Sequence, residues 1–110
     1  MNKGKYEILI KHLLGAKKYI ELRNYTLKRV TEKFNKQSKY VTEKIIYANH
    51  SAILIVAALK AKKASNSKIV SSLHIDLNNK EFFIEEDFEN FLNVYSEYIN
   101  ILSEELKKRE

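Results

Sequence analysis

Three histidines are the side chains of this chain best suited to proton transfer or metal binding: His12, His50 and His74. No two of them are spaced as in a His-x3-His or His-Glu-x-x-His motif, and the chain has no cysteine. A zinc site needs several such ligands in a short, regular spacing. We therefore expect neither a metal ion nor another cofactor.

His50 stands in the one polar interruption of an apolar segment, Asn49-His50-Ser51, just before an eight-residue apolar run at 52–59. A buried polar group needs hydrogen-bond partners. We interpret His50 as a hydrogen-bonded core histidine, and a catalytic His50 is the alternative. The sequence has no Gly-x-Ser-x-Gly motif, Walker loop or glycine-rich phosphate loop. These absences favour a protein that is not an enzyme.

A cluster of carboxylates is the other group of side chains that could take part in catalysis. It consists of Glu85, Glu86, Asp87 and Glu89. We interpret these acids as the start of a helix, where the macrodipole favours negative charge. Tyr95 and Tyr98 follow at helical spacing and are expected to pack in the core.

Charge is divided along the chain. Residues 1–68 carry sixteen Lys and Arg against four Asp and Glu, a net charge of +12, whereas residues 69–110 carry four against ten, a net charge of −6. This division predicts ion pairs between basic and acidic elements, together with a surplus basic surface for an anionic partner.

The basic residues of the first helix fall on the side opposite its apolar stripe. A basic face with an aromatic residue is typical of a nucleic-acid footprint, and a solvated helix face is the alternative. The candidate binding residues are Lys11, Lys17, Lys18, Tyr25, Lys28, Arg29, Lys33 and Lys36. Seventeen of the twenty basic residues are lysines, which favours binding with little sequence specificity.

Long helices are permitted throughout, because the chain has no proline and only two glycines. A seven-residue apolar series predicts one helix from about residue 5 to about residue 35, with Asn24 the expected place for a kink or early end. The series consists of Tyr6, Leu13, Ile20, Leu27 and Phe34.

A connection at 35–38, with Ser38 as N-cap, should lead into a second long helix. That helix is apolar nearly all round, which is typical of a central helix or of one buried in an oligomer. Because a four-helix bundle has no central helix, we expect a homodimer. The predicted dimer interface consists of Ile46, Tyr47, Ile53 and Leu54.

Residues 68–80 fit a helix or an extended segment, and we favour a short helix from about 67 to 74. A clear last helix carries Ile84, Phe88, Phe91, Tyr95, Tyr98, Leu102 and Leu106. The predicted fold is all-α, an antiparallel four-helix bundle with three long helices and one short helix, forming a single domain over 1–110. No signal peptide or membrane-length apolar run is visible, so we expect a cytoplasmic protein with no membrane partner.

The segment from Tyr47 through the apolar run to Leu59 resembles the second core helix of HEPN-type domains, and the order of elements is similar. The resemblance implies a four-helix bundle, often dimeric, that acts on or near RNA. The nuclease motif of that family, Arg followed after four to six residues by His, is absent here. A non-catalytic relative is what the resemblance implies.

Two functions therefore stand as hypotheses. The first is non-enzymatic binding of RNA or another polyanion with little sequence specificity. The second is a protein–protein interaction module, such as an antitoxin, immunity protein or accessory subunit, that uses the apolar face of the second helix and the acidic C-terminal helix.

Overall fold

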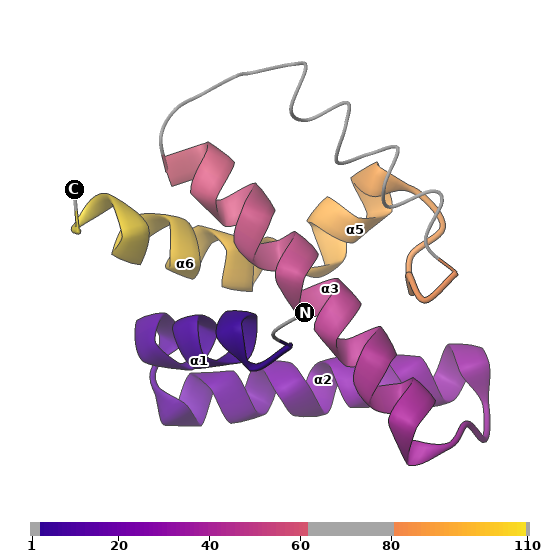
Figure 1. The fold of residues 1–110 in the computed structure, drawn as a ribbon. Coiled ribbons are helices and arrows are strands. Elements are labelled where there is room, and N and C mark those ends of the chain that lie inside the picture. Colours follow the sequence, from indigo (N-terminus) through magenta and orange to yellow (C-terminus); the bar gives the residue numbers. More distant parts are fainter. Residues whose placement is uncertain (1–2, 62–80, 110) are drawn as a thin grey trace.

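The computed structural model describes residues 3–61 and 81–109, and within these ranges it is all-helical, with no strand. This confirms the predicted all-α class. The helices are α1 (Lys3–Leu14), α2 (Ala16–Phe34), α3 (Lys39–Ala61), α5 (Phe88–Val94) and α6 (Ser96–Lys107), shown in Figure 1. The short helix predicted at 67–74, the alternatives for 68–80, and His74 lie outside the described residues.

Gly15 divides the long N-terminal helix that the apolar series predicted. Its φ of 89° lies in the left-handed region, which glycine adopts at no steric cost. The Gly15 N–H donates to the Lys11 carbonyl at 2.9 Å and closes α1. The chain then reverses, so that α1 and α2 lie side by side (Figure 1). The break expected at Asn24 is wrong, because α2 continues through that residue.

This reversal also changes which side of α2 faces the core. The buried residues of α2 recur every three or four positions: Tyr19, Leu22, Thr26 and Val30. Ile20 and Leu27, members of the predicted apolar series, are instead 54% and 40% exposed. Because Gly15 resets the chain direction, the series in α1 and the series in α2 no longer share one face.

The predicted cap of the second long helix is confirmed. Ser38 precedes α3, and its Oγ accepts a hydrogen bond from the Val41 N–H at 3.2 Å. From there α3 crosses the molecule and packs against α1, α2 and α6 (Figure 1). It is therefore the central helix.

The exposed apolar stripe on α3 from which the dimer interface was predicted is not found, and the homodimer itself stays a prediction. Ile46, Ile53 and Leu54 are at most 6% exposed within a single chain. Ile53 and Leu54 join a core with residues of α1, α2, α5 and α6, and Ile46 packs with Val30 of α2. Tyr47 is half-buried. The physical reason is the hairpin at Gly15, which places both α1 and α2 against α3, where the expected bundle has a single helix over residues 5–35.

The predicted last helix is divided as well. Ile84 precedes it, α5 ends at Val94, and Tyr95 separates α5 from α6 with φ −106° and ψ 14°. The Tyr95 ring is nonetheless fully buried against Phe91, and Tyr98 is half-buried, so both tyrosines pack in the core as expected. Asp87 caps α5, accepting a hydrogen bond from the Asn90 N–H at 2.6 Å.

α3 is also long and apolar enough to span a membrane by length and composition, and half of its apolar window is buried within the fold. A core helix of a soluble protein meets the same criterion. The cytoplasmic location and the absence of a membrane partner therefore remain predictions.

Candidate functional site

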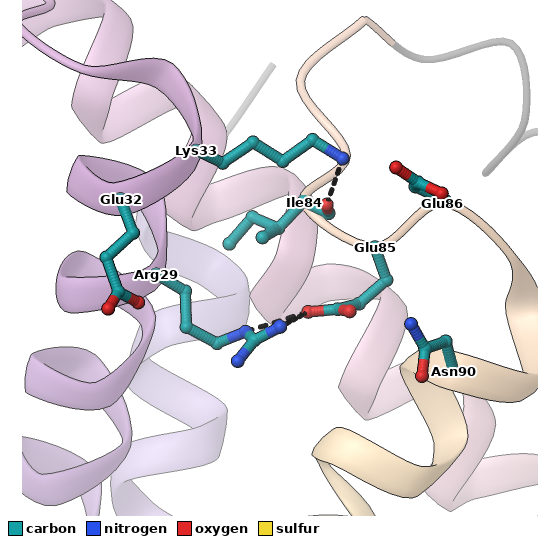
Figure 2. A pocket seen from close by; sticks show the side chains of 7 residues that line it. All are labelled: Arg29, Glu32, Lys33, Ile84, Glu85, Glu86 and Asn90. Atoms are coloured by element: carbon teal, nitrogen blue, oxygen red, sulfur yellow. Dashed lines mark hydrogen bonds and ion pairs between the residues drawn. The ribbon is translucent and has the colours of Figure 1, made fainter.

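Arg29, the centre of the predicted basic face, forms an ion pair inside the fold. Its Nε lies 2.7 Å from Glu85 Oε2, and its Nη2 contacts the same oxygen (Figure 2). The Glu85 side chain is only 4% exposed. Two donors of one guanidinium on a buried carboxylate make a strong, directional contact. Glu85 is therefore a partner of α2, and the prediction that it opens the last helix is wrong.

Three more of the predicted binding residues also contact the C-terminal part of the chain. Lys33 donates to the Ile84 carbonyl at 2.6 Å (Figure 2), and Lys18 Nζ lies 2.5 Å from Glu97 Oε2 of α6. The Tyr25 ring packs edge-on against Tyr95, with centroids 5.9 Å apart. The hydrogen bond to Glu97 raises the pKa of Lys18. These contacts confirm the predicted pairing between the basic and acidic parts of the chain.

A pocket of about 420 Å³ lies between α2 and the segment that leads into α5 (Figure 2). Its lining mixes both signs of charge: Arg29, Glu32, Lys33, Ile84, Glu85, Glu86 and Asn90. Both cations already bind acceptors within the pocket wall, Arg29 the Glu85 carboxylate and Lys33 a backbone carbonyl. An anion entering here would have to displace those contacts. The pocket therefore joins two parts of the fold and is a poor anion site.

The other four predicted binding residues are exposed: Lys11, Lys17, Lys28 and Lys36. None of them forms an ion pair with another residue of the described ranges 3–61 and 81–109. They are spread over α1, α2 and the connection after α2. The predicted basic face is thus divided into an internally paired half and a solvent-exposed half.

A further basic surface lies at the connection between α2 and α3, and of its residues only Lys36 was predicted from the sequence. We call it the α2–α3 corner and define it as Lys36, Lys39, Tyr40 and Lys44. Tyr40 is 61% exposed, and Lys44 Nζ lies 4.8 Å from the centre of its ring. In Figure 1 this connection lies at the lower right, away from α6. The spacing of three lysines around one tyrosine was the available signal.

A second polar cluster joins α1, α2 and α3. Arg23 Nη2 lies 2.6 Å from Glu43 Oε1, and Nη1 lies 3.4 Å from Glu7 Oε1. The Tyr19 hydroxyl donates to the same Glu7 oxygen. Burial, followed by the bond to Glu7, raises the pKa of Tyr19. Because its members come from three helices, no sequence spacing could have predicted this cluster.

His50 lies beneath that cluster and is completely buried. Its Nδ1 is 3.9 Å from Glu7 Oε1, and neither ring nitrogen has a hydrogen bond within the described part of the chain. Burial, and secondarily the charge of Arg23, lowers the pKa of His50 to about 3. The core position is as predicted, but the hydrogen-bonded role is not found. An enclosed, neutral ring is poorly placed to act on a substrate.

The two neighbours of His50 in the sequence both have hydrogen-bond partners. Asn49 is buried and donates to the Ile45 carbonyl at 2.7 Å, and Ser51 donates to the Ala48 carbonyl at 3.0 Å. His12 is exposed on α1. Over residues 3–61 and 81–109, no group of three or more His, Cys, Asp and Glu side chains is placed to hold a metal ion.

Comparison with known proteins leaves the chain without an assigned family. No family model matches it, and neither a curated protein nor a solved structure is significantly similar to it. The resemblance to HEPN-type domains therefore remains a prediction from the residues alone.

Proposed function

We propose that this protein binds RNA or another polyanion without catalysis and with little sequence specificity, through the α2–α3 corner. The observation that carries the proposal is the exposed Tyr40 ring with Lys44 Nζ 4.8 Å from its centre, in a stretch of sequence that also carries the exposed Lys36 and Lys39. Nucleic-acid strands bind such surfaces by stacking bases on an aromatic ring and by placing phosphates near cations. The resemblance to HEPN-type domains supports the same ligand class.

The charge balance at the corner favours an anion. The only acid between Lys36 and Lys44 in the sequence, Glu43, binds Arg23 and so is already compensated. Lys36 and Lys39 are exposed. The exposed Lys11, Lys17 and Lys28 add attraction at longer range, which steers an anionic partner toward the molecule.

Low specificity follows from the type of cation. Lysine is a flexible point charge, whereas arginine makes the two-point contacts that read guanine. Of the three arginines in the sequence, Arg23 and Arg29 are bound to carboxylates within the fold. Phosphate contacts and base stacking are thus the contacts that the corner offers.

The bundle architecture belongs to the same proposal: we infer an antiparallel bundle around α3, supported by its packing against α1, α2 and α6. The alternative function, a protein–protein module, rested on the apolar face of α3 and on the acidic C-terminal helix. That apolar face is mostly internal, and Glu85 and Glu97 are paired with basic residues. Neither surface favours that alternative.

The direct test is a titration of a fluorescent single-stranded RNA with the protein at increasing salt. Three lysine contacts predict a loss of affinity of about a hundredfold for a tenfold rise in salt, because about two counterions are displaced from a single strand. Substituting Lys36, Lys39 and Lys44 together by Gln should remove the salt-dependent binding.

The matched control is the triple Gln variant of Lys60, Lys107 and Lys108, which removes the same charge from the far end of α3 and from the C-terminal end of α6 with the residue that follows it. Equal loss of binding in both variants would contradict a site at the corner. The RNA should also remain intact, and sustained cleavage by purified protein would contradict the absence of catalysis.

A further inference from the structure

The outward face of α2 carries two large apolar residues that the fold does not cover. Ile20 is 54% exposed and Leu27 is 40% exposed. Seven residues separate them, so they lie two turns apart on nearly the same side of the helix. Tyr19 and Thr26 directly precede Ile20 and Leu27 in the sequence, and both are buried. α2 therefore has an inner apolar side and a second apolar stripe that faces solvent.

Polar residues with a regular arrangement border this stripe. In a seven-residue frame with Ile20 and Leu27 at position d, Asn24 occupies position a, while Glu21 and Lys28 occupy position e. All three polar residues are exposed. Positions a and d form the seam between two paired helices, and positions e and g carry the charges that determine their orientation. We call these five residues the α2 seam.

The α2 seam is complementary to itself. When two copies of α2 are placed antiparallel about a two-fold axis near Asn24, Glu21 of each copy lies opposite Lys28 of the other. The same axis brings Ile20 of one copy next to Leu27 of its partner. Each contact then occurs twice, as a two-fold interface requires. In a parallel arrangement, position e would face position g of the partner, where α2 carries Ala16, Arg23 and Val30, so Glu21 and Lys28 would not meet.

We propose that the α2 seam binds a second copy of this chain in an antiparallel α2–α2 contact. Charge complementarity selects this occupant, because both halves of each ion pair are present on the same surface. Glu21 Oε1 also lies 3.4 Å from Lys18 Nζ of its own chain, and the other carboxylate oxygen of this exposed residue is the one that would meet Lys28 of the partner copy. The contact is separate from the α2–α3 corner and does not depend on polyanion binding. With two apolar residues per copy, it belongs among the small, reversible interfaces.

Sedimentation equilibrium over about 10–500 μM protein tests this proposal in a range where weak dimers form. The wild-type protein should show a reversible monomer–dimer equilibrium. Glu21→Lys and Lys28→Glu should each raise the dissociation constant at least tenfold, since each substitution places like charges opposite one another twice. Circular dichroism checks that both variants keep the helical content of the wild type.

The decisive experiment mixes the two variants. In a mixed dimer, every position of the Glu21·Lys28 pair again joins opposite charges, so the mixture should dimerise as well as the wild type does. Glu89→Lys, on the exposed surface of α5, is the matched control and should leave dimerisation unchanged. A wild-type monomer throughout the range, a dimer that survives Ile20→Asp, or a mixture that stays monomeric would each overturn the proposal.

Discussion

The basic side chains of α2 and of the start of α3 fall into two groups. One group is bonded within the fold, and the other is exposed to solvent. At the C-terminal half of α2, Arg29 and Lys33 turn inward and hold the segment around Glu85. Beyond the end of α2, Lys36 and Lys39 remain in solvent beside the exposed Tyr40. The two regions are adjacent in sequence and similar in composition, yet one is bonded within the fold and the other is exposed to solvent.

The difference shows that the charge asymmetry of the sequence has two separable consequences. Part of the surplus positive charge is used to pair acids of the C-terminal third, as Arg29 does with Glu85 and Lys18 with Glu97. The remainder stays exposed. Substitutions in the first region should therefore change stability, and substitutions in the second should change binding.

The largest effect is expected at Arg29. Arg29→Ala leaves the Glu85 carboxylate buried without its partner, which should lower the free energy of unfolding by about 2–4 kcal/mol; the partial exposure of the arginine keeps the cost below that of a fully buried pair. Urea denaturation measures the loss. Lys11→Ala, at an exposed lysine of α1, should leave the midpoint unchanged, and a midpoint for Arg29→Ala equal to that of Lys11→Ala would show that the pair is not structural.

A second effect should appear at acidic pH, in the polar cluster around His50. The pKa of His50 is about 3 in the folded protein and about 6.5 when unfolded, so between these values the unfolded state binds one more proton. Stability should therefore fall as pH falls, by about 2 kcal/mol between pH 7 and pH 5 from this residue alone.

The comparison that isolates His50 uses His50→Gln with His12→Gln as the exposed control. Denaturation midpoints across that pH range should decline less steeply in His50→Gln than in the wild-type protein. A slope unchanged in His50→Gln would mean that His50 is not held neutral by burial.

The smallest of these effects concerns Tyr40. Removing its ring in Tyr40→Ala should weaken RNA binding by about 1 kcal/mol, or roughly fivefold, at the lower end of the range for stacking of one base. Tyr40→Phe keeps the stacking surface and should bind as the wild type does. Fluorescence anisotropy at low salt resolves this difference, and equal affinities for the Ala and Phe variants would exclude stacking on this ring.

Local features of the fold could be predicted from the sequence, and its long-range features could not. The Ser38 cap and the packing of Tyr95 follow from residue type and spacing, and both are found. The reversal at Gly15 was not predicted, because a glycine within a helical pattern is compatible with either a continuous helix or a break. The reversal at Gly15 determines which residues of α2 are buried, and it explains why α3 is central.

For the candidate site, the general pairing of basic and acidic parts could be predicted from the sequence, but the individual partners could not. The charge division indicated pairing between the two parts of the chain, but not that Arg29 would meet Glu85 or that Lys18 would meet Glu97. Such partners are separated by 56 and 79 positions in the sequence. Similarly, the contacts of Arg23 with Glu7 and Glu43 depend on three helices packing together.

One paired measurement tests the division of the basic residues most directly: RNA affinity and urea midpoint, determined for Arg29→Ala and for the Gln variant of Lys36, Lys39 and Lys44. We predict that Arg29→Ala lowers the midpoint while the folded protein keeps its RNA affinity. The corner variant should keep the midpoint and lose the affinity. Loss of RNA affinity in folded Arg29→Ala, with the corner variant binding as the wild type does, would contradict the division.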